Sequence, residues 1–312
     1  MDNRTKMVEL ETRRLGRTEM KPKALGLGCA FLGSPQRVDE DGAIEAVRYA
    51  IDQGVNFLDT SSGYGAGESE RRVGLALEDG YRKKIYLQTK AGTHPERQND
   101  YSADGIRWSV ENSLKRLRVN FIDSVLIHDP REDDNPLAPG AAFDALLQLK
   151  AEGIIGHMGI GVRSHEWHRK AIETGHCDIV LTFLDYTLIN QSAADTVIPL
   201  ALKNDVGVIL ASVQGMGLLA GPEPDIKIEE RRPPGQVQLA HDIWKWCQER
   251  DVNIRQLALG FCLAAPLNGN GMVLAGPANK LEVQEVLEAA TIPLPREVWQ
   301  EFEDRFGVGV KM

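Results

Sequence analysis

The segment VNFLDTSSGYG, residues 55–65, is a short apolar run that ends on a carboxylate, Asp59, and is followed five residues later by Tyr64 between two glycines. The same arrangement recurs downstream, where IYLQTK ends on Lys90 and DSVLIHD ends on His128 and Asp129. Runs of this length are typical of β-strands. The recurrence raises the hypothesis that several strands end on titratable side chains of one site.

Eight apolar runs of this kind alternate with longer amphipathic segments, which is typical of repeated βα units around a parallel sheet. We expect strands near residues 24–28, 55–58, 84–89, 122–127, 155–161, 178–182, 206–211 and 272–275. The pattern predicts an α/β protein with a closed (β/α)8 TIM barrel. An open doubly wound sheet is the alternative that spacing alone leaves open. We also expect an N-terminal β-hairpin, a long loop after the seventh strand at 212–235, helices near 237–250 and 254–264, and an extra C-terminal helix after Pro293.

Composition limits the classes of function. The 312 residues suit one barrel domain spanning 1–312, and a net charge of −9 without a basic stripe argues against a nucleic-acid partner. No apolar run reaches the roughly 18 residues of a membrane span, and the charged N-terminal segment lacks a secretory h-region, so we expect a cytoplasmic protein. The four scattered cysteines form no Cys-x-x-Cys motif, and His165 and His168 lack zincin spacing. We therefore expect neither disulfides nor a metal.

In a closed parallel barrel the C-terminal ends of all strands open on one face. Asp59, Lys90 and His128 would meet there with Tyr64. A tyrosine can protonate a carbonyl oxygen if nearby positive charge lowers its pKa from about 10, and Lys90 would supply that charge. Asp59 would keep the lysine protonated, and His128 would orient the carbonyl or share the proton. Each residue alone has an ordinary interpretation as a cap or a solvated strand end, but the four together indicate an active site.

These residues carry a resemblance. The stretches DTSSGYGAGESERRVGLAL, LQTKAG and SVENSLKRLRVNFIDSVLIHD resemble the aldo-keto reductase superfamily, whose pattern is an Asp-Thr-x-x-x-Tyr-Gly segment, a strand-end Lys and a strand-end His. The similarity runs from RRLGRTEMKPKALGLG to the last helices. It implies that Asp59, Tyr64, Lys90 and His128 correspond to the family's catalytic tetrad. It also implies the barrel, an NAD or NADP cofactor, and hydride transfer between a carbonyl and an alcohol.

The resemblance assigns cofactor contacts as well. It places Gly28 at the floor of the site and the cofactor against 212–221 and 275–286, where glycines and the helix starting near Asn279 suit a pyrophosphate. The family's Ser-Asn pair for the nicotinamide carboxamide matches Arg163 and Ser164, and its glutamine matches Phe183, with Asn190 or Gln191 as alternative contacts. The remaining candidate cofactor residues are Ser212, Gln214, Gly215, Gly217, Leu218, Gly276, Lys280, Glu282 and Glu285.

One departure from the family pattern bears on the cofactor, and one further resemblance bears on the substrate. Where members that prefer NADP present an arginine to the ribose phosphate, this chain has Glu282, so we expect NAD to be preferred over NADP. The His128-Asp129-Pro130 ending resembles the branch that oxidises sugars, so we expect a small-molecule sugar substrate oxidised at C1. The alternatives are an NADPH-dependent aldehyde or ketone reductase, a nucleotide-binding regulatory barrel, and a non-redox, lyase-type barrel.

Overall fold

The structure is a computed structural model and describes residues 9–225 and 233–310. Its centre is a barrel of eight parallel strands in chain order, in which β8 pairs back onto β1. The strands are β1 (Leu25–Gly28), β2 (Phe57–Asp59), β3 (Tyr86–Ala91), β4 (Ile122–His128), β5 (Ile155–Gly161), β6 (Ile179–Phe183), β7 (Gly207–Ala211) and β8 (Gly271–Ala275). Every predicted strand is present within two residues of its expected ends. The closure of β1 on β8 excludes the open sheet.

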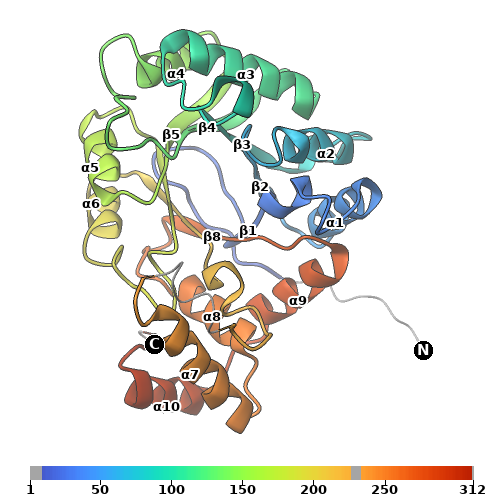
Figure 1. Ribbon diagram of the computed structural model, residues 1–312, viewed down its shortest axis with the longest axis vertical. Coiled ribbons are helices and arrows are strands. Elements are labelled where there is room, and N and C mark those ends of the chain that lie inside the picture. Colours follow the sequence, from blue (N-terminus) through green and yellow to red (C-terminus); the bar gives the residue numbers. More distant parts are fainter. Residues whose placement is uncertain (1–8, 226–232, 311–312) are drawn as a thin grey trace.

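Helices surround the strands on all sides (Figure 1). They are α1 (Glu40–Asp52), α2 (Glu68–Ala76), α3 (Ala103–Leu117), α4 (Ala142–Ala151), α5 (His165–Glu173), α6 (Val197–Lys203), α7 (Gln236–Glu249), α8 (Ile254–Leu263), α9 (Lys280–Thr291) and α10 (Arg296–Phe306). In α1, the apolar face is buried, and Asp39 caps the helix by accepting from the Gly42 amide. In the described residues, no helix is long and apolar enough to cross a membrane.

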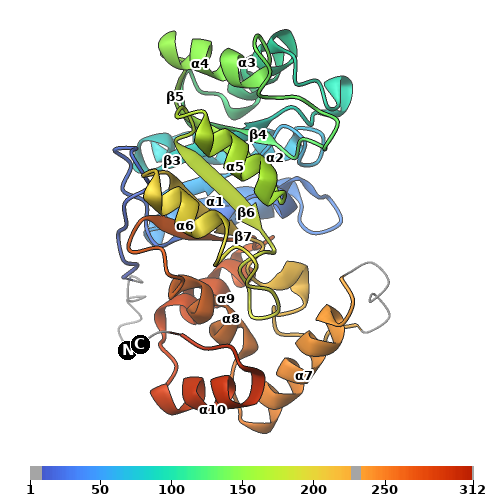
Figure 2. The same cartoon turned by 90° about the vertical axis from the view of Figure 1, so that its left-hand side faces the viewer.

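The described part of the chain also contains four short 3₁₀ turns, of which two border the site. These are η1 (Ala30–Gly33), after β1, and η4 (Gly215–Gly217), after β7; the other two are η2 (Tyr81–Lys84) and η3 (Pro95–Arg97). The predicted long loop after β7 is present, although its residues 226–232 lie outside the described residues. The predicted extra C-terminal helix, α10, packs on α7 through Phe302 and Trp246, whose ring centroids are 5.3 Å apart. The helices α7 and α10 lie at the end of the molecule away from α4 (Figure 2).

The predicted N-terminal hairpin is present and very short. It consists of one antiparallel bridge between Thr12 and Lys23, flanked by hydrogen bonds from the Arg13 amide to Pro22 and from the Ala24 amide to Glu11. Its turn carries Leu15 and Met20 into a cluster with Phe57, Leu126, Ile179, Leu181, Ile209, Met272 and Leu274. Because these strand residues point inward, the cluster fills the barrel from the N-terminal ends of the strands. The opposite, C-terminal face is left open for a site.

Candidate active site

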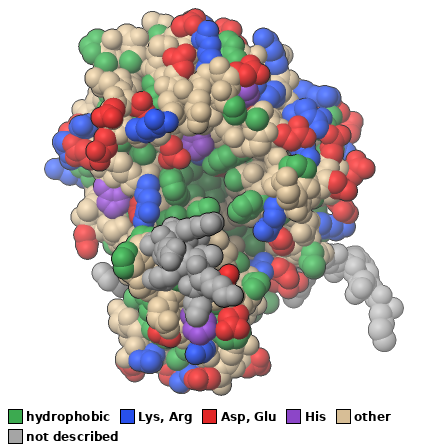
Figure 3. Space-filling view, in the orientation of Figure 1, with side chains coloured by type: hydrophobic (Ala, Val, Ile, Leu, Met, Phe, Trp, Pro, Cys, Tyr) green, Lys and Arg blue, Asp and Glu red, His purple; other side chains and the backbone are tan. Residues whose placement is uncertain are grey.

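The four titratable residues predicted to converge do converge. Asp59 is the last residue of β2, Lys90 is the penultimate residue of β3, His128 is the last residue of β4, and Tyr64 lies in the loop after β2. All four line one cavity of about 940 Å³ at the C-terminal ends of the strands. On the surface this cavity is a hollow in the middle of the face, walled largely by hydrophobic side chains (Figure 3).

A buried ion pair forms the base of the site. Lys90 Nζ donates to Asp59 Oδ2 at 2.5 Å and to the Thr60 carbonyl at 3.0 Å, and the lysine side chain is 1% exposed. Asp59 Oδ1 accepts from Gln88 Nε2, whose own amide oxygen accepts from Ser124. Burial alone would lower the pKa of Lys90, but attraction to Asp59 and Tyr64 outweighs burial and raises that pKa. Lys90 is therefore a fixed cation.

The tyrosine lies directly against this cation. Lys90 Nζ is 3.2 Å from the Tyr64 hydroxyl and 4.8 Å from the centre of its ring. We expected Lys90 to bring the tyrosine pKa down. Lys90 does act in that direction, but burial outweighs it and Asp59 adds to the burial effect, so the pKa of Tyr64 lies above its ordinary value of 10. In this state Tyr64 is a neutral hydroxyl, which is the form that donates a proton.

Two glycines allow the Tyr64 loop to lie this close. Gly65 has a φ of +60°, and a Cβ added to it would lie 2.4 Å from the carbonyl oxygen of Gly33 in η1. A Cβ at Gly33 would in turn come within 3.0 Å of the Tyr64 carbonyl. Only residues without side chains permit this approach. The glycines beside Tyr64 therefore fix the depth at which its hydroxyl enters the cavity.

The histidine is oriented by two hydroxyl groups. His128 Nδ1 lies 2.8 Å from Ser61 Oγ and 2.8 Å from Thr93 Oγ1, which leaves Nε2 as the nitrogen nearer Asp129, 3.6 Å from its carboxylate. The ring meets the Tyr64 ring edge-on with centroids 5.5 Å apart. Burial, with repulsion from Lys90, holds the pKa of His128 well below 6.5. A neutral imidazole can therefore direct a hydrogen bond at a substrate oxygen.

Seven of the predicted cofactor residues line the same cavity. They are Gly28, Ser212, Gln214, Gly217, Gly276, Glu282 and Glu285. The Nε2 atom of Gln214 is buried and has no hydrogen-bond partner in the described chain, so a ligand oxygen could satisfy it. Gly217 and Gly221 have φ values of +102° and +120°, and both line the cavity. The site thus has the volume, the glycine-rich wall and an unpaired donor that fit a nicotinamide dinucleotide.

Five other predicted cofactor residues do not line this cavity. Gly215 and Leu218 face the core, because a Cβ at Gly215 would meet Leu218 and Ile189. Lys280 pairs with Glu45 at 2.8 Å on the outer face of α1. The other two, Arg163 and Ser164, are held by contacts outside the cavity.

The residues after β5 and β6 form contacts with each other instead. Arg163 Nε donates to the buried Asp185 at 3.0 Å, and Ser164 accepts from the Trp167 amide as the N-cap of α5. The two proposed substitutes are also engaged, because Asn190 donates to the Leu184 carbonyl and Gln191 to the Thr187 carbonyl. None of these four positions lines the cavity in the described structure, and their contact with a cofactor stays a prediction. At the end of β6, Phe183 lines the cavity where the resemblance implies an amide.

Glu282 has more partners than the sequence indicated. Its carboxylate accepts from the Ala278 amide at 2.8 Å and lies 3.4 Å from the guanidinium of Arg37, a cavity residue after η1. Asn279 caps α9 by accepting from the Glu282 amide. The helix terminus that we expected to face a pyrophosphate is therefore partly satisfied by its own side chains. Arg37 also reduces the negative potential that Glu282 presents.

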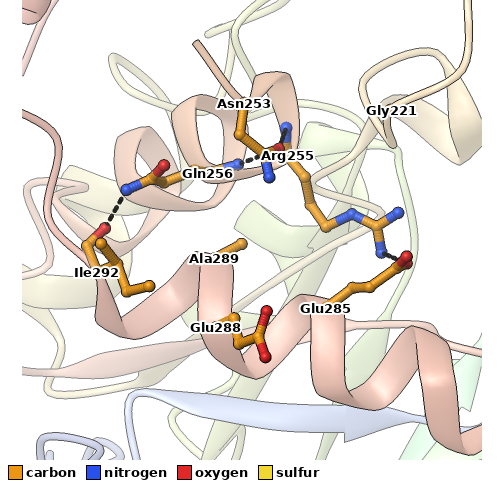
Figure 4. Close-up of a pocket in the computed structure, with 8 residues that line it drawn as sticks. All are labelled: Gly221, Asn253, Arg255, Gln256, Glu285, Glu288, Ala289 and Ile292. Carbon is orange, nitrogen blue, oxygen red and sulfur yellow. Dashed lines mark hydrogen bonds and ion pairs between the residues drawn. The ribbon is translucent and has the colours of Figure 1, made fainter. Parts of the chain in front are cut away.

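A second arginine borders the far end of the cavity. Arg255, near the start of α8, donates to the Ala220 carbonyl at 2.6 Å and pairs with Glu285 of α9 at 2.8 Å. Figure 4 shows this pair in a side cavity of about 300 Å³, also lined by Gly221, Asn253, Gln256, Glu288, Ala289 and Ile292. Arg255, Glu285 and Gly221 line both cavities. Sequence reasoning missed Arg37 and Arg255, because neither belongs to a motif.

Other positioning residues were also missed. Gln88, which holds Asp59, could have been found, because it lies two positions before Lys90 and shares its face of the strand. Ser61 and Thr93 follow strand ends and carry no comparable signal. In the described part of the chain, no three His, Cys, Asp or Glu side chains are placed to hold a metal ion.

Known proteins match this chain over most of its length. The Aldo/keto reductase family model matches residues 24–305. D-threo-aldose 1-dehydrogenase of Pseudomonas sp is 31% identical, with 90% of this chain and 93% of the relative covered, and L-galactose dehydrogenase of Arabidopsis thaliana is 32% identical, with 91% and 89% covered. The holo form of an aldo-keto reductase from Bacillus halodurans superimposes with a TM-score of 0.80 and 26% identity over 97% of this chain and 98% of that one. The chain therefore belongs to the aldo/keto reductase family and is an NAD(P)-dependent oxidoreductase.

Proposed function

We propose that this protein oxidises a sugar at C1, with Tyr64 as the acid/base and NAD as the preferred cofactor. The observation that carries the proposal is the buried Lys90–Asp59 pair in contact with the Tyr64 hydroxyl, beside a neutral His128. The names of two relatives, D-threo-aldose 1-dehydrogenase and L-galactose dehydrogenase, support a sugar as the substrate.

Each residue has a distinct role in this proposal. Tyr64 takes the proton of the C1 hydroxyl during oxidation and returns it to the carbonyl oxygen during reduction. Lys90 stabilises the phenolate, since its ammonium lies 3.2 Å from the phenol oxygen. Asp59 keeps Lys90 charged, and His128 Nε2 hydrogen-bonds the reacting oxygen. The nicotinamide, when bound, accepts or supplies the hydride.

The preference for NAD is supported by the carboxylate of Glu282 at the cavity wall, which would repel a ribose phosphate. Arg37, 3.4 Å from that carboxylate, acts against this repulsion. The preference is therefore expressed as a ratio of kcat/KM values rather than as the exclusion of NADP.

The test is to measure initial rates of NADH and NADPH formation across a panel of aldoses, polyols and aromatic alcohols. We expect an aldose to react, with the higher kcat/KM for NAD. Tyr64→Phe should lower kcat about 10²- to 10⁴-fold, the range for loss of a general acid–base group. Tyr81→Phe is the matched control, because the Tyr81 hydroxyl bonds only Asp52 at the surface in the described structure. Activity that survives Tyr64→Phe would contradict the proposed role.

A second candidate, reduction of an aldehyde or ketone, is favoured by one observation. The raised pKa of Tyr64 keeps its hydroxyl protonated at neutral pH, which suits proton donation. The two directions have opposite pH dependences. Oxidation should become faster as the pH rises toward the tyrosine pKa, whereas reduction should lose rate there, so pH profiles measured in both directions separate the candidates.

A further inference from the structure

Asp129 is a cavity carboxylate to which the tetrad chemistry gives no role. It follows His128 directly at the end of β4, and its amide donates to the Gly161 carbonyl of β5 at 2.9 Å. Its φ of +43° is uncommon for a residue with a side chain, although Asp and Asn tolerate this region best. Backbone strain of this kind concentrates at functional sites. The strand end thus holds a carboxylate at the rim of the cavity beside the tetrad.

Among the described residues, this carboxylate has no lysine or arginine partner at close range. Within the residues that the structure describes, no lysine or arginine lies within 4.0 Å of it, and its nearest basic group is the neutral imidazole of His128 at 3.6 Å. Burial raises the pKa of Asp129 to about 6, although Lys90 opposes the rise. The side chain is nevertheless 45% exposed, and it lines the cavity. Its oxygens are therefore accessible acceptors.

The ends of the neighbouring strands β5, β6 and β7 add no competing polar side chain to the cavity. The neighbouring strand ends contribute Gly161, Leu181, Phe183 and Ala211 to the cavity, which are all apolar or lack a side chain. A substrate bound at the tetrad with hydroxyl groups beside its reacting carbon would need an acceptor for them. Asp129 is adjacent to His128, where the reacting oxygen would bind.

We propose that Asp129 is a specificity-determining residue that accepts hydrogen bonds from hydroxyl groups next to the reacting carbon, so that the protein selects polyhydroxylated substrates. The proposal rests on the proposed function at the tetrad and names the substrate class of that site. It predicts that an aldehyde bearing neighbouring hydroxyls is used better than one of equal length without them.

The test compares glyceraldehyde with propanal, which has the same carbon chain without hydroxyls. In the wild type, kcat/KM for reduction should be higher for glyceraldehyde. Asp129→Asn removes the charge, keeps one acceptor oxygen and retains a residue tolerated at positive φ. It should lower the glyceraldehyde-to-propanal ratio about 5- to 10-fold, the difference between a hydrogen bond to a charged acceptor and one to a neutral acceptor. Glu132→Gln is the matched control, since it removes an exposed charge from the same loop outside the cavity lining and should leave the ratio unchanged.

A pH profile separates recognition from a structural effect. The titratable groups that interact with Asp129 in the described structure are Lys90, Tyr64, His128 and Tyr101. The pKa values of Lys90, Tyr64 and Tyr101 lie above their ordinary values, and the pKa of His128 lies well below 6.5. A change in the ratio near pH 6 is therefore assigned to Asp129. The wild-type ratio should therefore fall as the pH drops through about 6 and Asp129 becomes protonated. Asp129→Asn should abolish that dependence.

The outcomes distinguish this inference from the function on which it rests. If the wild type reduces both aldehydes and Asp129→Asn lowers both values equally, or lowers neither, the inference is overturned and the tetrad function stands. If the wild type turns over no aldehyde and no alcohol of the panel with either cofactor, the proposed function fails and the inference fails with it. A lower ratio in Asp129→Asn together with a flat pH profile supports the inference.

Discussion

Replacing Lys90 by methionine should destabilise the protein far more than a lysine replacement at the surface. Methionine fills a similar volume but removes the only ammonium that the described structure places against Asp59. The side chains of the pair are 1% and 5% exposed. Asp59 would remain a buried carboxylate, hydrogen-bonded by Gln88 alone among the side chains described.

The size of the effect follows from that burial. Removing one partner of a buried ion pair costs about 3–5 kcal/mol, because the remaining charge stays desolvated. The comparison is Lys84→Met, which breaks a pair with Asp52 whose side chains are 52% and 46% exposed. Such surface pairs contribute up to about 1 kcal/mol. Removing both charges with Lys90→Met and Asp59→Asn should cost less than Lys90→Met alone, because no uncompensated carboxylate remains.

Equilibrium unfolding in urea, followed by far-ultraviolet circular dichroism, measures all three variants. With a slope of about 3 kcal/mol/M, the midpoint for Lys90→Met should fall by about 1 M or more. The midpoint for Lys84→Met should change by a third of that or less. The reasoning is refuted if Lys90→Met loses no more stability than Lys84→Met, or if adding Asp59→Asn makes Lys90→Met still less stable.

Two further predictions concern stability elsewhere. His168 is fully buried, and burial lowers its pKa to about 4, so between pH 6.5 and 4 the unfolded chain binds a proton that the folded chain does not. The free energy of unfolding should therefore fall by roughly 2–4 kcal/mol as the pH drops through this window. The fall should be smaller in His168→Gln and unchanged in the exposed control His176→Gln. An equal fall in both variants would contradict the assignment to His168. Gly65→Ala should lower both the urea midpoint and kcat, because the new Cβ would meet the Gly33 carbonyl. The control is Gly80→Ala: Gly80 has a φ of +89° and nothing within 4 Å of an added Cβ, so the change should cost only about 1–2 kcal/mol and leave kcat intact. Equal effects of the two variants on kcat would count against the role of Gly65.

Local sequence patterns were sufficient for the eight strands, whereas the choice of a closed barrel over an open sheet was supported by the family resemblance and decided by the pairing of β1 with β8. Each strand was visible as a short apolar run between amphipathic segments, and parallel closure requires all strand ends to meet on one face. The convergence of Asp59, Lys90 and His128 therefore follows from their positions at strand ends and does not depend on which side chains they contact. The position of Tyr64 near them could be predicted because it lies only five residues after the end of β2.

Side-chain direction beyond the strand ends could not be predicted in this way. Arg163 lies two residues after β5, where the resemblance implied a cofactor contact, but it turns to the buried carboxylate of Asp185 on another loop. Arg37 and Glu282 are 245 positions apart in the sequence, and their contact exists only because η1 and α9 meet across the cavity.

Periodicity and chain order were enough to predict the eight strands and the four residues at their ends, because both properties depend on local sequence. Which groups are desolvated and which charges are compensated became apparent from the packed fold. Burial and the distance to partners on distant elements set these properties, so that burial raises the pKa of Tyr64 although Lys90 lies beside it. The same physics leaves Asp129 at the cavity wall without a cationic partner in the described chain.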